Sequence, residues 1–548
     1  MEAGIGHSAV PGGHVIEIET IAIILFFLAY FIIFVRTTAW IIMKKRIIWA
    51  VAALFSAGLL HAQTLGQDAR YCNPLPMEIG QGSASGDVSV FQWEGKYYMF
   101  CTGGGAWVSS DMLNWEYHYV AGVPVAPDVC PYNGKFYMTG NSSNVWVADN
   151  PLGPYEVLGQ WKGVPDLEHG WSQGFDPHIY VDENNQPYLF WPGMAISGIY
   201  SVKLDPKDIT QFVGPVTHHF SFNPDHVWER QGEQNEFTDV AWIEGPWIYK
   251  HNGTYYLQYS ASGTQWRTYA EGYYKAKKVQ GPYEYAPNNP LLRRTDGIVT
   301  GPAHGSMVTG PDGHIWQFYT VVLRSGGRRI GMDRVLVDKD GNLTCNVTDT
   351  PQWAPGVVKN PAKGDSGSII VSIGKTTMST GQGFPGAAKV ASSAKPGRGP
   401  EYALDNSTAT WWEPAEDDAN PVLTISLSPA VDRDRVQTFR IDGARLLFGG
   451  GARRGFSGAA SAAPIYKYKI EVSMDGKDWS TALDQSGNQV PRNVLFDEIA
   501  PVECRYVRLT MLDWPKASPL SILDFSVFGR ATGYSPSQVP VPTPKVMK

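Results

Sequence analysis

The segment Asn252-Gly253-Thr254-Tyr255-Tyr256-Leu257 places a tight-turn pair directly before an aromatic-rich run. Asn-Gly between apolar runs is the strongest short-range signal for a β-hairpin, because a type I′ turn needs positive φ at both central residues. Four further segments repeat the pattern: Glu94-Gly95-Lys96-Tyr97-Tyr98-Met99-Phe100, Asn133-Gly134-Lys135-Phe136-Tyr137-Met138, Asn184-Asn185-Gln186-Pro187-Tyr188-Leu189-Phe190 and Asp312-Gly313-His314-Ile315-Trp316-Gln317-Phe318. The copies lie roughly 40 to 70 residues apart, which suits four-stranded propeller blades with some long loops. The sequence therefore predicts an all-β fold that begins with a five-bladed β-propeller over residues 66–358.

A second all-β domain is expected over residues 366–531. Its strand patterns are Val422–Leu427, Tyr466–Val472 and Tyr506–Met511. Their alternation with period two favours an antiparallel β-sandwich. The Pro- and Gly-containing segment 360–368 is interpreted as a linker. Residues 532–548, rich in Pro, Ser and Val, are expected to be a disordered tail.

The N-terminal region carries a targeting signal. A basic stretch, Met43–Arg46, precedes the apolar run Ile47–Leu60 and the small residue Ala62, which is typical of a signal peptide over residues 43–62. This predicts a periplasmic or secreted bacterial protein, without stable membrane insertion after cleavage. Residues 1–42 contain the apolar run Ile21–Val35, short for a spanning helix. We interpret them as an upstream extension from a misplaced start codon, with a membrane segment as the alternative.

The composition narrows the kind of partner. The chain is 12% aromatic with 19 Trp, which suits stacking on sugar rings but suits β-sheet cores equally well. A net charge of −7 argues against nucleic acid, whose phosphates need a basic surface. The five cysteines are scattered and odd in number, so we expect buried free thiols rather than a disulfide framework or a zinc site. A single bridge between Cys101 and Cys130 is the alternative.

Three acidic residues stand just before predicted hairpins: Asp87, Asp176 and Glu244. Each precedes its hairpin by about ten residues, so we expect them at equivalent positions on inner strands that converge on the propeller's funnel. Trp242 and Trp247 flank Glu244, and apolar surroundings raise a carboxyl pKa and favour the protonated acid. Hydrolysis of a glycosidic bond needs such an acid at the leaving oxygen and a second carboxylate opposite it.

From about Cys72 to Pro355 the chain resembles glycoside hydrolase family 43, through the motifs Phe175–Asp182 and Trp242–Pro246. The resemblance implies a five-bladed propeller and hydrolysis with inversion by single displacement. It also implies roles for the three carboxylates: general base for Asp87, tuning of the acid's pKa and orientation for Asp176, and general acid for Glu244.

Two departures from the family pattern bear on the base. Val88 stands where the family's base motif usually has proline. Val125 stands where tryptophan is common in the signature of the second blade, Val125-Ala126-Pro127-Asp128-Val129. Asp128 is therefore the alternative base, although we interpret it as structural.

The resemblance also marks His304, in Gly301-Pro302-Ala303-His304-Gly305-Ser306, as the family's fifth-blade histidine. In many members that residue faces a central cation, often calcium, through water. The alternative is a histidine satisfied within the core. Either Arg328 or Arg329 could place a guanidinium at a sugar hydroxyl, and Arg329 is the predicted substrate ligand; a solvated basic turn is the alternative.

Three tryptophans, Trp107, Trp191 and Trp242, are candidates for stacking on a sugar ring, with core packing as the alternative for at least one of them. These rings would line the substrate site next to the carboxylates.

The C-terminal domain resembles a discoidin, or coagulation factor 5/8 type C, domain. The supporting stretches are Ala403–Trp412, Ile470–Trp479 and Arg505–Leu509. In secreted glycosidases such modules bind glycan or brace the catalytic domain, and both roles stay open. The loop Asp405-Asn406 often holds a structural calcium in that family. The chemistry itself is expected to need no cofactor.

The resemblance implies a carbohydrate substrate and exo-hydrolysis of terminal sugars on plant or algal polysaccharide. We expect an α-L-arabinofuranosidase, with β-galactofuranosidase or β-xylosidase as alternatives. The loop Ser221–Asp239, rich in Glu and Asn, suggests a pocket closed on one side, hence exo action. A catalytically inactive glycan-binding propeller is the alternative from another class, and the presence of all three carboxylates disfavours it.

Overall fold

The computed structural model describes residues 69–79, 86–167, 174–356, 366–374, 391–427, 435–449, 464–516 and 518–536. The predicted signal peptide, the segment before it and most of the predicted linker lie outside these ranges. The described residues from Arg70 onward belong to one compact unit. None of the helices in the described ranges has the length and apolar content that a bilayer crossing requires.

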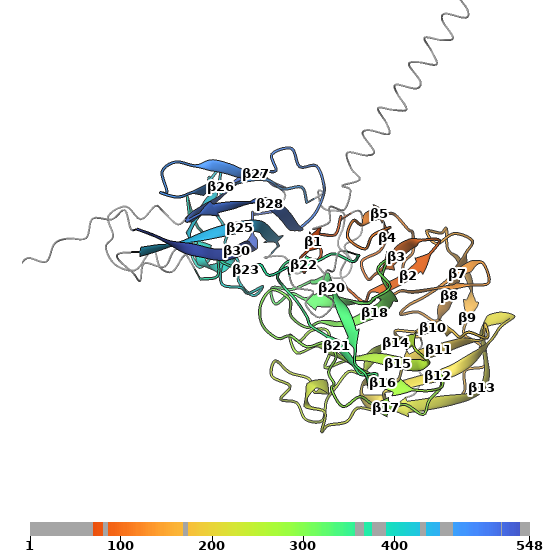
Figure 1. Ribbon diagram of the computed structural model, residues 1–548. Helices are drawn as coiled ribbons and strands as arrows, with labels where there is room; N and C mark the ends of the chain where they lie inside the picture. The colour runs from red at the N-terminus through yellow and green to blue at the C-terminus, as the bar shows by residue number, and fades with distance from the viewer. Residues whose placement is uncertain are drawn as a thin grey trace, which may run out of the picture. The chain divides into compact units, whose positions relative to one another are not determined.

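Five four-stranded antiparallel sheets follow one another along the chain, each with its strands bonded in sequence order (Figure 1). They are blade 1 with β2 (Ser89–Trp93), β3 (Lys96–Phe100), β4 (Ala106–Ser109) and β5 (Glu116–His118); blade 2 with β6 (Asp128–Tyr132), β7 (Lys135–Thr139), β8 (Asn144–Ala148) and β9 (Glu156–Gln160); blade 3 with β10 (His178–Val181), β11 (Pro187–Pro192), β12 (Ile199–Asp205) and β13 (Asp208–Phe220); blade 4 with β14 (Glu244–His251), β15 (Thr254–Ala261), β16 (Ala270–Ala276) and β17 (Glu284–Tyr285); and blade 5 with β18 (Ala303–Thr309), β19 (Ile315–Val322), β20 (Arg328–Val337) and β21 (Leu343–Cys345). The predicted five-bladed propeller is confirmed.

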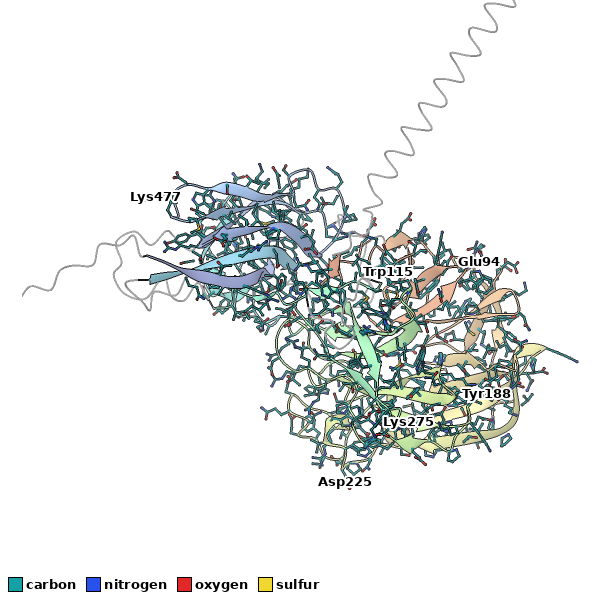
Figure 2. All side chains as sticks on the ribbon, viewed as in Figure 1. Glu94, Trp115, Tyr188, Asp225, Lys275 and Lys477 are labelled. Carbon is teal, nitrogen blue, oxygen red and sulfur yellow. The ribbon has the colours of Figure 1, made fainter. Side chains whose placement is uncertain are left out.

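The predicted turns join the first and second strands of the blades. In blade 1, Trp93 pairs with Lys96 across Glu94 and Gly95, whose φ angles are 48° and 75°. Two consecutive positive φ angles are what a type I′ turn requires, so Asn-Gly or Glu-Gly occupies these sites. Glu94 is labelled in Figure 2. Blades 3 and 5 have longer turns, since Val181 pairs with Pro187 and Thr309 with Ile315.

Apolar side chains fill the space between consecutive blades. The cluster between blades 5 and 1 joins residues far apart in sequence, such as Val90 and Met99 with Phe318 and Met332. The two ends of the propeller chain are also joined there by a two-stranded sheet, in which β1 (Arg70–Tyr71) pairs with β22 (Gln352–Trp353). The first and last blades are therefore held together by core packing and by backbone hydrogen bonds.

The C-terminal domain is the predicted β-sandwich. One sheet has the order β23 (Ile369–Ile370), β30 (Ile522–Pro536), β25 (Arg435–Phe448) and β28 (Val494–Cys504), and the other has β24 (Val422–Ser426), β29 (Tyr506–Asp513), β26 (Lys467–Ser473) and β27 (Ser480–Asp484). Buried and partly exposed residues alternate along β29, as period-two patterning predicts. Because β30 runs to Pro536, residues 532–536 belong to a strand, and the predicted start of a disordered tail at residue 532 is wrong. Residues 537–548 lie outside the described ranges.

The sandwich packs on the propeller through a buried cation. Arg445 has no exposed surface, and its guanidinium bonds Asp524 at 2.9 Å and Ser526 Oγ at 3.0 Å. The same guanidinium donates to the backbone carbonyls of Asn73 and Asp349 beside β1 and β22, both at 2.7 Å. We call these groups the Arg445 cluster. Apolar side chains of the sandwich extend the cluster between blades 4 and 5: Leu447, Val494 and Leu523.

All five cysteines are buried thiols outside any disulfide, which confirms the prediction: Cys72, Cys101, Cys130, Cys345 and Cys504. The alternative bridge between Cys101 and Cys130 does not form. The thiols therefore act as small apolar core residues.

Candidate active site

One residue with a positive φ angle stands where the inner strand of each blade begins. We call these the ring residues: Asp87 (52°), Ala126 (48°), Asp176 (41°), Gly245 (58°) and His304 (43°). Each stands two positions before the residue at which the regular strand pairing begins or resumes, namely Ser89, Asp128, His178, Trp247 and Ser306. The five positions are therefore structurally equivalent.

The ring residues line a cavity where the five inner strands converge. Its wall consists of each ring residue and the residues that follow it: Asp87, Val88, Ser89, Ala126, Pro127, Asp128, Asp176, Pro177, His178, Gly245, Pro246, Trp247, His304 and Gly305. The charged ring residues, Asp87, Asp176 and His304, come from blades 1, 3 and 5. This is the funnel that the sequence predicted for the chemistry.

Glu244 is not a ring residue. It lies one position earlier, and the pairing of β14 shifts register between Glu244 and Trp247. The ring position of blade 4 is Gly245, where a Cβ atom would come within 2.7 Å of His304 Cδ2. The predicted equivalence of the three carboxylates is therefore correct for Asp87 and Asp176 and wrong for Glu244, because the imidazole of His304 leaves no room for a side chain at Gly245.

Asp87 is buried between two cations. Its Oδ1 lies 2.7 Å from Arg328 Nη1 and 3.2 Å from His304 Nδ1, and its Oδ2 accepts from Thr102 Oγ1 at 2.6 Å. Burial alone would favour the neutral acid, but the charges of Arg328 and His304 hold the pKa of Asp87 well below its ordinary value. Asp87 is therefore a carboxylate, as a general base must be.

The other two carboxyls are shifted the opposite way. Burial and the neighbouring Asp176 raise the pKa of Glu244 to about 8, so this acid keeps its proton at neutral pH. Burial and the charge of Asp87 raise the pKa of Asp176 to about 6, against the opposing charge of His304. Tyr269 donates its hydroxyl proton to Glu244 Oε1 at 2.5 Å. Like charges in one buried site thus keep the protonation states of Asp87 and Glu244 apart.

His304 is a cation inside the ring. Its Nδ1 lies 3.2 Å from Asp87 and 3.8 Å from Asp176. Burial opposes the charge, but the charges of Asp176 and Asp87 raise the pKa of His304 to about 10. A protonated imidazole has no lone pair for a metal. His304 is therefore not a direct metal ligand, and its predicted contact with a central cation through water stays a prediction.

The remaining donors of the cavity wall do not suit a directly bound calcium either, which takes about six to eight oxygen ligands. The oxygens of Asp128 already accept from Ser89 Oγ at 3.0 Å and from the backbone nitrogen of Ile179 at 3.0 Å. Across the described ranges, no three His, Cys, Asp or Glu side chains are grouped so as to hold a metal ion. The same bonds fit the interpretation of Asp128 as a structural residue that links the inner strands of blades 1, 2 and 3.

The two arginines of β20 face opposite ways, as neighbours on a strand do. Arg328 reaches Asp87, whereas Arg329 turns away and lies beside Gly449 of the sandwich. Burial lowers the pKa of Arg329 to about 10, and its Nη1 donates to the carbonyl of Arg328 at 2.8 Å. The predicted role of Arg329 in substrate binding is wrong, and the arginine of the site is Arg328.

The three tryptophans predicted to stack on sugar differ in their burial. Trp107 and Trp191 have no exposed surface and belong to the clusters between blades 5 and 1 and between blades 2 and 3. Their predicted contact with sugar is wrong, because a ring closed in by the core has no face to offer. Trp242 is partly exposed and meets Phe175 edge to face at 5.8 Å. It stays a candidate for substrate stacking.

A set of polar side chains at the ends of second strands was missed from the sequence. Each accepts the backbone N–H of the next blade's ring residue: Thr102 from Ala126 (2.8 Å), Asn141 from Asp176 (2.7 Å), Ser260 from His304 (2.8 Å) and Thr320 from Asp87 (2.9 Å). In blade 4 the N–H of the ring residue, Gly245, donates instead to the carboxyl of Asp176. Thr102, Asn141, Ser260 and Thr320 each follow the glycine of their hairpin by seven positions, so counting from the hairpin would have found them.

Hydrolysis of a glycosidic bond needs an ionised and a protonated carboxyl, which this propeller provides in Asp87 and Glu244. The comparison with known families agrees with that chemistry. Residues 81–343 match the model of glycosyl hydrolases family 43, which act on O-glycosyl bonds with inversion. Residues 387–523 match the F5/8 type C domain. The chain therefore carries a family 43 glycoside hydrolase domain followed by an F5/8 type C domain.

Among curated relatives, a β-D-galactofuranosidase of Aspergillus niger is 26% identical over 215 residues, 38% of this chain and 53% of that protein. A xylosidase/arabinosidase of Butyrivibrio fibrisolvens is 27% identical over 216 residues, 36% of this chain and 37% of that protein. The chain thus spans about half the length of these relatives or less. The crystal structure of a thermostable family-43 glycoside hydrolase is 27% identical, with a TM-score of 0.44, and covers 52% of this chain and 99% of that one.

Proposed function

We propose that the protein is an inverting glycosidase in which Asp87 is the general base, Glu244 the general acid and Asp176 the group that tunes the acid. The observation that carries the proposal is the opposite protonation of two buried carboxyls, Asp87 held ionised by Arg328 and His304 and Glu244 held protonated by burial and Asp176. Such a pair divides the roles of acid and base.

The proposed reaction is a single displacement. Asp87 takes a proton from a water molecule as that water forms a bond to the anomeric carbon. The glycosidic bond breaks at the same time, and Glu244 gives its proton to the leaving oxygen. The product sugar carries the inverted configuration, and proton exchange with water restores both carboxyls. No cofactor takes part in these steps.

For the substrate, we propose a terminal α-L-arabinofuranosyl residue on plant or algal polysaccharide. Relatives named as a β-D-galactofuranosidase and as a xylosidase/arabinosidase support sugars of this kind. The ring carbons of α-L-arabinofuranose and β-D-galactofuranose have the same configuration, so β-D-galactofuranose is the first alternative and β-D-xylose the second.

Exo action is supported by the loop Ser221–Asp239. It contains η2 (Val227–Glu229), and Glu229 is buried within it, bonded to Tyr259 Oη at 2.6 Å. The carbonyl of Gly232 in the same loop accepts from Thr268 Oγ1 at 2.6 Å, next to the residue that contacts Glu244. The loop is thus fixed beside the site, where it can form one wall of a pocket.

We propose that the F5/8 type C domain braces the propeller, because the Arg445 cluster and Leu447, Val494 and Leu523 are buried between the two. A periplasmic or secreted location remains our proposal from the predicted signal peptide. We also propose that a calcium in the propeller centre is held through water and that, like a calcium at Asp405-Asn406, it is structural, so removal of divalent cations with EDTA should lower the melting temperature and leave kcat of the folded enzyme unchanged.

The test is hydrolysis of nitrophenyl α-L-arabinofuranoside, β-D-galactofuranoside and β-D-xyloside, with the anomer of the first product read by proton NMR. We expect the wild type to hydrolyse at least one of these glycosides and to release a product of inverted configuration. Asp87→Asn should show no such turnover. A retained anomer would contradict the mechanism. Turnover of none of them, together with retained binding to arabinan or arabinoxylan, would favour the inactive glycan-binding propeller instead.

A further inference from the structure

Tyr269 contacts the proposed acid from within the core. Its hydroxyl lies 2.5 Å from Glu244 Oε1, and its ring has no exposed surface and packs on Ala303 and Val322. Tyr269 donates a side-chain hydrogen bond to Glu244, and this bond favours the ionised form of the acid. The family motifs do not include Tyr269, which lies in the connection between β15 and β16.

The hydroxyl of Tyr269 is the donor in this contact. Burial and the charge of Glu244 raise the phenol's pKa well above its ordinary value, so the O–H keeps its proton across the pH range in which the enzyme works. The turn that carries the residue is fixed: the N–H of Tyr269 donates to the carbonyl of Trp266 at 3.1 Å, and Thr268 Oγ1 donates to the carbonyl of Gly232 at 2.6 Å.

A fixed donor at Oε1 determines where the acid proton of Glu244 resides. An oxygen that accepts the phenol proton presents a lone pair, so the carboxyl proton must sit on the other oxygen, Oε2. When Glu244 gives that proton away, Oε1 becomes part of a carboxylate, and the bond from Tyr269 becomes charge-assisted and stronger. The contact therefore stabilises the transition state more than the ground state.

We propose that Tyr269 is a positioning residue that keeps the proton of Glu244 on Oε2 and stabilises the carboxylate left by proton transfer. The inference rests on the proposed role of Glu244 as general acid. Tyr269 has no exposed surface from which to touch substrate, so its effect should fall on kcat and on the pH profile rather than on KM.

The experiment uses Tyr269→Phe and aryl glycosides of the sugar that the wild type hydrolyses best. A dinitrophenolate leaves without a proton, so we expect near wild-type turnover of the dinitrophenyl glycoside. A phenolate needs the proton, so kcat for the phenyl glycoside should fall about 10- to 100-fold with little change in KM. The bond from Tyr269 favours the ionised form of Glu244, so its loss should move the basic limb of the pH profile to higher pH.

A merely structural role would lower turnover of all aryl glycosides alike and leave the pH profile in place, and that result would overturn the proposal. Tyr259→Phe is the matched control, because Tyr259 is also fully buried and donates to a glutamate, Glu229, at 2.6 Å. It should lose similar stability and keep the wild-type leaving-group dependence.

If Tyr269→Phe does not fold, 3-fluorotyrosine at position 269 replaces it. The more acidic phenol is a stronger donor, so the basic limb should move to lower pH; an unmoved limb overturns the proposal. Inactivity of the wild type on every glycoside would reject the proposed function itself. Wild-type activity that Asp87→Asn abolishes, with an unchanged leaving-group dependence in Tyr269→Phe, would reject only the inference about Tyr269.

Discussion

Two buried ionic groups in this molecule are built differently. In the Arg445 cluster one cation meets one carboxylate, Asp524, and Arg445 also bonds two backbone carbonyls and a serine hydroxyl. At the propeller funnel, Asp87 and Asp176 lie within 4 Å of the cations Arg328 or His304, and Glu244 interacts electrostatically with both cations. Among the described residues, Asp176 Oδ2 has no hydrogen-bond donor.

The difference shows how the numbers of buried carboxyls and cations affect the protonation of buried groups. A buried ion pair whose donors and acceptors are all satisfied keeps both of its charges, even though burial raises the pKa of Asp524. Burial, together with an excess of carboxyls over cations, raises the pKa of Glu244 to about 8, so this carboxyl holds a proton at neutral pH. The Arg445 cluster holds the two domains together. The funnel keeps a protonated acid, Glu244, near an ionised base, Asp87.

The largest effect should come from replacing the proposed general base, Asp87. Asp87→Asn keeps the shape of the side chain and its bond to Thr102 but cannot accept a proton from water. We expect kcat/KM to fall by about 10³-fold or more, since general base catalysis contributes up to about 10⁴. Circular dichroism and the melting temperature should show a folded protein. More than a tenth of wild-type activity would contradict the assignment of the base.

Breaking the Arg445 cluster should cost stability instead of activity. Arg445→Met leaves Asp524 buried without its cation, and we expect a loss of about 3–5 kcal/mol in the free energy of unfolding, measured in urea. The kcat of the folded fraction should be unchanged. Arg398→Met is the control, because Arg398 lies over Trp411 at the surface of the sandwich. The double variant Arg445→Met/Asp524→Leu should recover much of the loss, and no recovery would contradict the view that an unpaired charge is the cause.

Removing one charge from the funnel tests the imbalance directly. Asp176→Asn takes away the negative charge that helps to raise the pKa of Glu244, so that pKa should fall from about 8. The basic limb of the pH profile should move to lower pH, with kcat reduced about 10- to 100-fold near neutrality. The loss should be greater at the alkaline end than at the acidic end of the profile. A limb that moves upward would reverse the assigned electrostatics.

The smallest effect is expected at the rim of the site. Trp242→Leu removes a partly exposed ring beside Phe175, and stacking on such a ring contributes about 1 kcal/mol, so KM should rise about fivefold with little change in kcat. Trp191→Leu, at a fully buried ring, should lower the melting temperature and leave KM unchanged. An unchanged KM in Trp242→Leu would remove this ring from the substrate site.

The parts of this fold that could be predicted are those encoded by short local patterns. The repeated turns, two of which are Asn-Gly, predicted the five blades, and the distance from turn to acid placed Asp87 and Asp176 on the funnel. Glu244 was found by its motif, but its offset from the ring was not, because a register shift in β14 leaves no local mark. The choice between Arg328 and Arg329 depends on the phase of one strand. That phase follows the pairing of β20 with β19, in which Arg328 lies opposite Val322 and Arg329 opposite Val321, and a local sequence pattern does not reveal it.

Three polar contacts of Asp87 cross the boundary between the first and the last blade of the propeller. Asp87 precedes the first strand of blade 1, whereas its partners Arg328, His304 and Thr320 belong to blade 5. During synthesis the ribosome must therefore release more than two hundred further residues before the base meets its cations. Contacts of such sequence separation form late and slowly. The enzyme should thus gain activity in a single step, when blade 5 packs against blade 1. Nascent chains that stop before Arg328 should show no activity, although their early blades are already folded.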